Sequence, residues 1–570
     1  MTSSSSSVSS SSSLPDATAL RRVVARGYRW ADLQADLFAG VVVGIVALPL
    51  SMALAIGAGV PPQHGLYTAV VAGAATALLG GCKFQVTGPT AAFVVILAPI
   101  ASQYGLQGLL TAGFLAGLAL VLLGFARLGS LIRFVPYPVT TGFTTGIAVV
   151  IATIQVKDVL GLGIEHLPDR YVDKLAALWA ARGTIQPEEA VVAAATLALL
   201  LGVPRLGVRI PAPLVAVGTV SVAVAALHAA FPAFDVATIG SRFPTTVDGV
   251  EYAGIPPVLP RPALPWGAGL PSWALIEALL PSAFAIAMLG AIESLLSAVI
   301  ADGLTGKRHD PNAELVGLGV GNLLAPLFGG IAATGALART ATNIRSGARS
   351  PLAAVVHAAV VLLAIALLAP LVAYVPMAAL GALLLLVAWN MSEVHHFVGL
   401  LRIAPKSDVA VLLTCFLLTV WFDMVVAVTV GFLLAAILFM RRMAELTEAR
   451  LVLDGGNEAG EPTLPPGVSL YQINGPLFFG AARTALDALG ATNTDFRVLV
   501  LDLSRVPVVD ATGIVALRSA LDGLHRAGKR VVLAGPLPRP DDALARAGLL
   551  DDPRVVVAPD LPSALRAAER

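Results

Sequence analysis

Two short stretches, GGCKFQVTGPTAA (Gly80–Ala92) and GGIAATGALARTATN (Gly329–Asn343), interrupt an otherwise apolar chain. In each, a Gly-Gly pair closes an apolar segment and a Thr-Gly pair follows, Thr87-Gly88 in the first and Thr334-Gly335 in the second. Paired broken segments at matching places in two halves of a membrane protein point to a transporter's binding site. A helix that begins inside the membrane offers free backbone N–H groups and the positive end of its dipole, which suits an anion.

The composition places most of the chain in a lipid bilayer. Of its 570 residues 57% are hydrophobic and 13% are charged, and the mean hydropathy is +0.83. Soluble domains carry about 25% charged residues. The net charge of +1, without a dense basic patch, gives no indication of nucleic-acid binding. Residues 1–28 begin with a serine tract that has no apolar core, so we expect a disordered tail there, neither signal peptide nor span.

Full-length membrane spans need about 20 apolar residues each. Stretches of this kind start near Leu37, Gly65, Gln107, Pro138, Glu189, Pro213, Ala274, Glu314, Pro351, Tyr374, Asp408 and Asp423. The two broken segments bring the expected total to 14, seven on each side of a proline-rich stretch at 231–271. The expected fold is therefore an α-helical membrane protein with two seven-segment halves.

The placement of positive charge supports this count. With a cytoplasmic N-terminus, lysines and arginines gather in the loops on the cytoplasmic side, and the short loops opposite carry almost none. The cytoplasmic set is Lys83, Arg127, Arg133, Arg205, Arg209, Lys307, Arg308, Arg345, Arg349, Arg402, Lys406, Arg441 and Arg442. Dropping either broken segment would invert the pattern for everything downstream, so both segments must be counted.

The composition changes after Arg442. We expect a transmembrane domain over residues 29–443, a linker over 444–467 and a cytoplasmic α/β domain over 468–570, because strand and helix patterns alternate there. The expected buried strands are Val468–Ile473, Val498–Leu503, Lys529–Ala534 and Val555–Ala558.

Two charged residues are the main candidates for chemistry. Glu293 lies in the apolar run AFAIAMLGAIESLLSAVI, where an ionised side chain costs about 2.5–3.5 kcal/mol. We interpret it as a coupling-ion or proton site, with a structural hydrogen bond to a neighbouring helix as the alternative. Arg339 lies about one turn into the second broken segment, and its fork of donors can bind both oxygens of a carboxylate. Alternatively, Arg339 offsets the negative charge of Glu293 or only anchors the cytoplasmic end of its own segment.

The first break has the composition of a helix start. Thr87 can cap a helix, Pro89 suits a first turn, and Gly88 lets the backbone approach a ligand. The histidines lack metal-ligand spacing and the chain has no P-loop, so we expect no metal, no cofactor and no enzymatic activity.

These residues resemble the sulfate permease (SulP) family of anion transporters, which carry a C-terminal STAS domain. The resemblance covers the chain from about Arg29 and is carried by four stretches: ALPLSMALAIGAGVPPQHGLYT (Ala47–Thr68), Gln85–Phe93, MLGAIESLL (Met288–Leu296) and the Arg339 segment. It implies two inverted seven-segment repeats of the UraA-like kind, split into core and gate domains. It also implies a homodimer and an elevator-like movement of the core.

Within the family the chain is most similar to the bacterial aerobic C4-dicarboxylate transporters, through GPTAAFVVILAP, AMLGAIESLLSAV, AELVGLGVGNLLAP and VAWNMSE. That similarity implies proton-coupled uptake of succinate, fumarate, malate or aspartate across the inner membrane. The alternatives are sulfate or bicarbonate symport with H⁺ or Na⁺, and a membrane sensor that signals through the STAS domain. Sulfate-type members often carry a glutamine where this chain has Leu50 and a serine where it has Ala338, which makes this pocket less polar.

The resemblance also implies roles for individual residues. Glu293 would be the proton-coupling site, and the substrate pocket would consist of Met52, Thr87, Gly88, Pro89, Thr90, Phe93, Ala336, Ala338 and Arg339. Thr512, in VVDATGI (Val508–Ile514), occupies a position that is phosphorylated in regulatory relatives, with a helix cap as the alternative. The expected partners are a small anion, a proton, membrane lipid, a second copy of the chain and, by resemblance, acyl carrier protein at the STAS domain.

Overall fold

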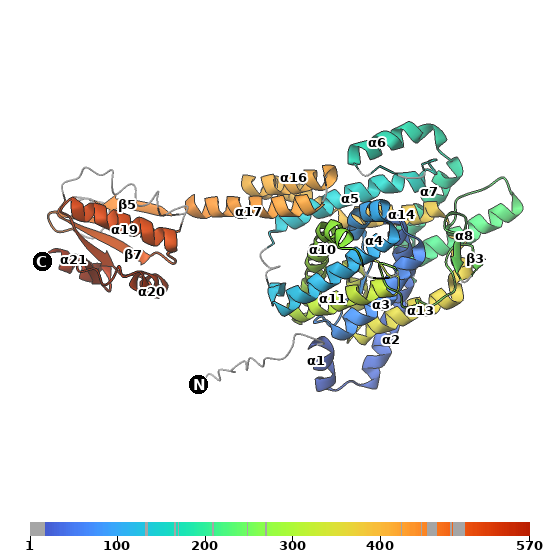
Figure 1. Ribbon diagram of the computed structural model, residues 1–570, viewed down its shortest axis with the longest axis horizontal. Coiled ribbons are helices and arrows are strands. Elements are labelled where there is room, and N and C mark those ends of the chain that lie inside the picture. Colours follow the sequence, from blue (N-terminus) through green and yellow to red (C-terminus); the bar gives the residue numbers. More distant parts are fainter. Residues whose placement is uncertain are drawn as a thin grey trace. The chain divides into compact units, whose positions relative to one another are not determined.

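The computed structural model describes residues 18–130, 135–164, 167–168, 170–207, 210–247, 249–267, 269, 271–422, 424–445, 447–452, 464–478, 482 and 496–570. Residues 1–17 of the predicted tail lie outside these residues, whereas Thr18–Arg26 forms helix α1, so the expectation of disorder over residues 1–28 is wrong for this part. The chain divides into two compact units between Phe432 and Leu433, a point inside helix α17 (Met424–Glu445), and α17 is described with the first unit (Figure 1).

The first half of the membrane unit contains seven helical segments. They are α2 (Trp30–Gly57), α3 (Pro62–Leu79), both halves of α4 (Ala91–Phe125), α5 (Tyr137–Val159), α7 (Pro187–Gly202) and α8 (Ala212–Ala230). Helix α4 counts twice because Gly105 leaves helical geometry, with φ 66° and ψ −172°, a conformation suited to glycine. Its second half begins where the sequence predicts a span, near Gln107.

The second half repeats this series. Its segments are α10 (Trp273–Thr305), α11 (Pro311–Leu327), α12 (Leu337–Arg345), α13 (Leu352–Val372), α14 (Met377–Met391), α16 (Lys406–Trp421) and α17 (Met424–Glu445). The described residues thus contain the 14 segments predicted, and every predicted full-length span overlaps one of these helices. Nine helical stretches of the described chain are long and apolar enough to cross a membrane.

Shorter elements connect these segments. They are α1 (Thr18–Arg26), α6 (Tyr171–Ala180), α9 (Ile239–Arg242), α15 (Val394–Ile403) and the antiparallel pair β2 (Thr245–Val247) and β3 (Val250–Tyr252).

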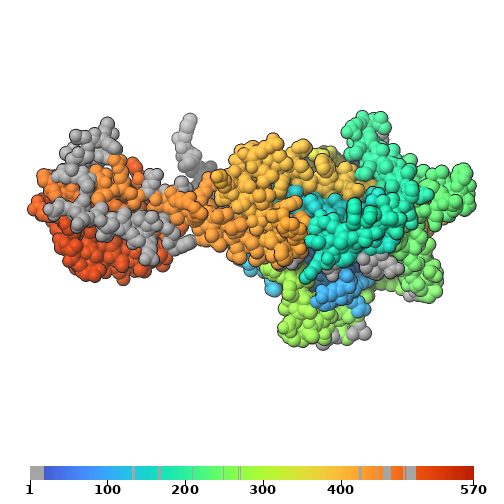
Figure 2. All heavy atoms as spheres, turned by 90° about the horizontal axis from the view of Figure 1, so that it is seen from above, coloured from blue at the N-terminus to red at the C-terminus, as the bar shows by residue number. Residues whose placement is uncertain are grey.

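The two halves interlock through a core of helices. Helix α3 packs against α13 and α11, and α11 packs against α4, so each half supplies neighbours for the other (Figure 1). Small residues permit this approach: a β-carbon on Gly319 would lie 2.6 Å from the backbone nitrogen of Val121. A second group pairs α5 with α14 and α16, and α14 with α7. Figure 2 shows the yellow and orange residues of this group beside the teal residues. These are the core and gate groups that the resemblance implies.

The C-terminal unit is an α/β domain with a five-stranded sheet in the order β5-β6-β7-β8-β9. The strands are β5 (Glu448–Val452), β6 (Val468–Asn474), β7 (Val498–Arg505), β8 (Arg530–Ala534) and β9 (Val555–Ala558), all parallel except β5. The four predicted strands are confirmed. Strand β5 lies within the predicted linker range and was missed, because EARLV lacks the continuous apolar run of a buried strand.

Helices cover both faces of this sheet. Leu517 and Leu521 of α19 (Ala511–Arg526) and Leu544 of α20 (Pro538–Arg546) pack with one set of alternating strand residues. Ala564 and Ala568 of α21 (Leu561–Ala568) pack with the other set. This alternation follows from the two-residue period of side chains along a strand.

Candidate functional site

The two sequence breaks meet inside the core helices. Thr87–Gly88 forms strand β1 and Thr334–Gly335 forms strand β4, and the two pair antiparallel with Thr87 opposite Gly335 and Gly88 opposite Thr334. All four residues are buried. The backbone nitrogen of Ala336 extends the pairing by donating to the carbonyl oxygen of Val86 at 2.9 Å. The matching motifs of the two halves are therefore direct neighbours.

Each short strand leads into a helix start. Helix α4 begins at Ala91 after the N-cap residue Thr90, and α12 begins at Leu337 after the N-cap residue Ala336. Neither N-cap side chain accepts a hydrogen bond from its own helix. The first N–H groups of both helices thus lack the usual side-chain cap, which leaves their donors and positive dipole ends for another acceptor. Pro89 precedes the N-cap residue and lies two residues before the first helical position, Ala91, so the prediction that Pro89 occupies a first-turn position is wrong.

Arg339 is buried on α12 with an exposed fraction of 1%. Its Nη2 donates to the carbonyl oxygen of Pro89, while Nε and Nη1 have no partner. No carboxylate in the described part of the chain forms an ion pair with it, so the guanidinium does not pair with Glu293. Buried cations are normally paired, and two unused donors beside two helix starts form a site of positive potential.

Glu293 reaches the same region from α10. Its Oε2 accepts a hydrogen bond of 2.9 Å from Oγ1 of Thr90, the residue at the start of α4. The side chain is partly buried. The Glu293 carboxyl group therefore lies at the start of α4, and the Arg339 guanidinium contacts Pro89, the residue just before Thr90.

The remaining predicted pocket residues differ in burial and in the part of the structure that they line. Phe93 is buried, and its ring lies 3.4 Å from the position of a β-carbon on Gly290, one turn before Glu293. Ala336 is buried and Ala338 is exposed. Met52 lines an apolar hollow between α2, α3 and α13, together with Leu48, Leu66, Ile255, Ala364, Ile365, Leu368, Ala369 and Val372.

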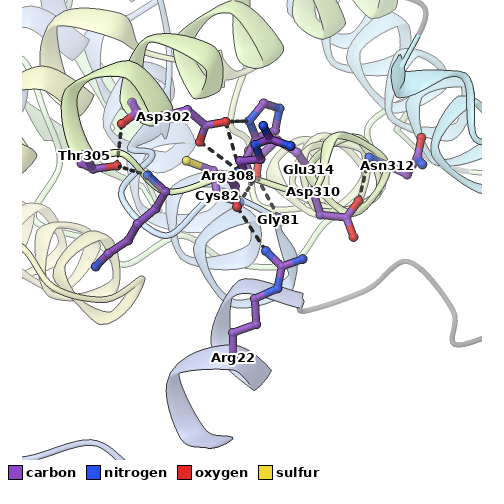
Figure 3. A network of polar contacts seen from close by, with 12 residues as sticks. Arg22, Gly81, Cys82, Asp302, Thr305, Arg308, Asp310, Asn312 and Glu314 are labelled. Carbon is purple, nitrogen blue, oxygen red and sulfur yellow. Dashed lines mark hydrogen bonds and ion pairs between the residues drawn. The ribbon is translucent and has the colours of Figure 1, made fainter. Parts of the chain in front are cut away.

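A second buried carboxyl group was missed by the sequence analysis. Oε2 of Glu314 on α11 accepts from the backbone nitrogens of Gly81 at 2.9 Å and Cys82 at 2.8 Å (Figure 3). Its Oε1 accepts from Nε2 of Gln85 at 2.7 Å, and that amide also donates to Oγ of Ser294 at 2.5 Å. Glu314 lies in an apolar run, AELVGLGVGNLLAP, so the reasoning applied to Glu293 could have found it.

Side chains of the second break also bind the backbone of the first. Oγ1 of Thr340 accepts from the nitrogen of Val86 at 3.1 Å, and Nδ2 of Asn343 donates to the oxygen of Phe84 at 2.9 Å. These contacts satisfy backbone groups that the breaks would otherwise leave unpaired inside a membrane. The two breaks, α10 and α11 therefore form one connected unit around the site.

Sequence comparisons place these features among known proteins. Residues 33–415 match the model of the Sulfate permease family, and residues 461–564 match that of the STAS domain. The chain is 41% identical to the "Putative sulfate transporter YvdB" of Bacillus subtilis, over 92% of this chain and 95% of that protein. It is 30% identical to the "Bicarbonate transporter BicA" of Picosynechococcus, over 88% of this chain and 89% of that protein.

Solved structures share the fold. A structure titled "The overall structure of SLC26A9" matches with a TM-score of 0.84 over 96% of this chain and 92% of that chain, at 19% identity. The transmembrane domain of a cyanobacterial bicarbonate transporter, BicA, matches with a TM-score of 0.59 at 28% identity, over 72% of this chain and 98% of that chain.

Proposed function

The chain belongs to the sulfate permease family of anion transporters, and we propose that it takes up a small carboxylate-bearing anion together with a proton. The observation that carries this proposal is Arg339, a buried guanidinium with two unpartnered donors beside two uncapped helix starts. The planar donor fork of arginine matches the two oxygens of a carboxylate. The anion would sit between the first turns of α4 and α12, with Thr87, Gly88, Pro89, Thr90, Phe93, Ala336 and Ala338 around it and Met52 at its edge.

Coupling would depend on Glu293. Its hydrogen bond with Thr90 ties the carboxyl group to the start of α4, where the anion would bind. An ionised Glu293 would repel a bound anion in this environment of low dielectric constant, and protonation would remove that repulsion. Anion and proton would then favour each other's binding, which is the thermodynamic basis of symport. Na⁺ could serve the same purpose, so both ions belong in the test.

The substrate class follows from resemblance and from the pocket. The resemblance of four sequence stretches to bacterial C4-dicarboxylate transporters is our reason for proposing succinate, fumarate, malate or aspartate as substrate. The names of two relatives support bicarbonate and sulfate instead. Leu50 and Ala338 make the region less polar than in sulfate-type members, which favours a carbon-bearing anion over sulfate. We therefore rank dicarboxylates first, bicarbonate second and sulfate third.

The remaining assignments follow the family. We propose a homodimer in the bacterial inner membrane with cytoplasmic termini, in which the core helices carry the anion across by an elevator-like movement. We keep the division at residues 28, 443 and 467 as a proposal, with helix α1 inside the first range and strand β5 inside the linker range. Thr512 is exposed at the start of α19, where Asp510 and not Thr512 is the N-cap residue, and we propose Thr512 as a site of regulatory phosphorylation. Acyl carrier protein is the partner to test at the STAS domain.

Counterflow in proteoliposomes tests this function. Proteoliposomes with the purified protein are loaded with unlabelled succinate, bicarbonate, sulfate or chloride, and entry of labelled succinate, bicarbonate and sulfate is followed with inward H⁺ or Na⁺ gradients. Succinate-driven counterflow that an inward proton gradient accelerates supports the proposal. Exchange of bicarbonate or sulfate without succinate would overturn the substrate ranking. Zero flux of every anion, with ligand-dependent phosphorylation of Thr512, would favour a sensor.

A further inference from the structure

The short helix α1 is attached to the turns that hold the first break. The backbone nitrogen of Ala19 donates to the oxygen of Gly80 at 3.3 Å, and Nη1 of Arg22 donates to the backbone oxygen of Arg308 at 3.2 Å. Figure 3 shows Arg22 reaching from α1 toward the turn that contains Arg308. Ala19 and Val23 are buried in this contact. Helix α1 therefore connects the turn after α3 with the turn between α10 and α11.

Four positive side chains converge where these three segments meet. We call them the basic cluster: Arg22 and Arg26 of α1, Lys83 of the turn after α3, and Lys307 of the turn after α10. Burial lowers the pKa of Lys83, and the charges of Arg26, Lys307 and Arg22 lower it further. The ammonium of Lys307 lies 5.3 Å from the ring centre of Phe84, next to Lys83. The cluster thus concentrates like charge from segments far apart in the sequence.

Nearby carboxylates do not balance this charge. Asp302 binds His309, with 2.7 Å between Oδ2 and Nδ1, and Asp310 accepts hydrogen bonds at the start of α11. Glu314 is occupied by Gly81, Cys82 and Gln85. Among the residues that the structure describes, no member of the basic cluster forms an ion pair. The general excess of Lys and Arg in cytoplasmic loops does not require such convergence without counter-charges.

The surface beside the cluster suits a lipid. Val24 of α1 is 69% exposed and lies between Arg22 and Arg26 in the sequence. A short helix that combines basic residues with an exposed apolar residue is typical of segments at the boundary between headgroups and acyl chains. Basic residues near that boundary attract anionic headgroups. We propose that the basic cluster binds the phosphate of an anionic lipid headgroup and thereby holds α1 against the turns of the core helices.

The test uses the full-length protein in detergent, titrated with phosphatidylglycerol, phosphatidylcholine or inorganic phosphate and read by native mass spectrometry. The double variant Lys83→Gln/Lys307→Gln is compared with Arg402→Gln/Lys406→Gln, which removes two exposed positive charges elsewhere. Each basic residue contributes about a factor of five to binding of an anionic headgroup, so the first pair should weaken phosphatidylglycerol binding on the order of 25-fold. The second pair should leave it unchanged.

A second measurement guards against misfolding of the double variant. Acetylation of Lys83 in the unaltered protein should slow at least several-fold on addition of phosphatidylglycerol, whereas acetylation of exposed Lys406 should not. The single variant Arg26→Gln should weaken lipid binding about fivefold. Equal binding of phosphatidylcholine, equal loss in the control pair, or protection of Lys83 by inorganic phosphate alone would each overturn the lipid assignment. Transport is not measured, so the outcome is independent of the proposed function.

Discussion

Gly88 and Arg339, from opposite halves of the chain, fit so closely that a β-carbon on Gly88 would lie 2.5 Å from Nη1 of Arg339. The other break shows the same relationship, because a β-carbon on Gly335 would lie 2.3 Å from Nε2 of Gln85. Each Thr-Gly pair therefore makes room for a long polar side chain from the opposite break. The glycines are needed for this close approach, since both have ordinary backbone angles.

Gly88→Ala tests this fit. The added methyl group would displace the guanidinium, because the three atoms nearest to the new β-carbon all belong to the Arg339 guanidinium. A charge-assisted hydrogen bond contributes about 1.5–3 kcal/mol, so anion uptake should fall at least about tenfold. Initial uptake rates in proteoliposomes measure the effect. Gly218→Ala on α8 is the matched control, because nothing lies within 4 Å of its β-carbon position, and it should transport normally. Normal uptake by Gly88→Ala would contradict the role given to Arg339.

Arg339→Lys tests whether the site needs the planar guanidinium or only a positive charge. Lysine keeps the positive charge but loses the planar fork that binds two oxygens of one carboxylate. We expect the KM for the transported anion to rise about tenfold with a smaller change in maximal rate, since one charge-assisted hydrogen bond is lost. Concentration-dependent uptake gives both values. An unchanged KM would show that the guanidinium has only a structural role.

Glu314→Gln tests the network that holds the first break. The carboxylate accepts from three donors, whereas a glutamine would turn its own N–H groups toward some of them. Leaving a buried donor without an acceptor costs about 1–3 kcal/mol, so the melting temperature should fall. Glu277→Gln changes an exposed carboxyl group on α10 and should leave the melting temperature unaltered. Equal melting temperatures of the two variants would contradict the role of Glu314 in holding the first break.

Much of the fold could be predicted from local sequence, because membrane spans and buried strands each need an apolar stretch of characteristic length. Span starts such as Gln107 and Tyr374 are marked by apolar length, and the buried strands of the C-terminal domain are marked by apolar runs. Strand β5 was missed because an edge strand needs no such run, and the residues EARLV alone do not reveal its pairing with β6, the next strand in the sequence.

The site was predictable only in part. The repeated Thr-Gly pairs and the charges of Glu293 and Arg339 stood out against an apolar background. The Gln85–Glu314 hydrogen bond did not, because it joins residues more than 200 positions apart and polar residues in apolar runs do not reveal their partners. Likewise, the sequence could not show that Arg339 contacts Pro89 and leaves two donors free, since this depends on how α12 packs against the first break.

The C-terminal domain provides a prediction about pH. The Arg554 guanidinium lowers the pKa of the Asp552 carboxyl from its usual 3.8 to about 2. The folded-state pKa is depressed, so this pair stabilises the fold above pH 3.8, and the contribution is lost as the pH falls through about 2. A carbon-detected NMR titration should find the Asp552 midpoint near 2, and Arg554→Gln should return it toward 3.8. An Asp552 midpoint that stays near 2 in Arg554→Gln would rule out the pairing.

The most direct test of the central claim, that the paired breaks hold an anion whose uptake is coupled through Glu293, is succinate uptake by Glu293→Gln proteoliposomes with and without an inward proton gradient. The unaltered protein should take up succinate faster with the gradient. The variant keeps a group that can accept from Thr90 but cannot be deprotonated, so it should exchange succinate and lose the response to the gradient. A full response to the proton gradient in Glu293→Gln would contradict the account.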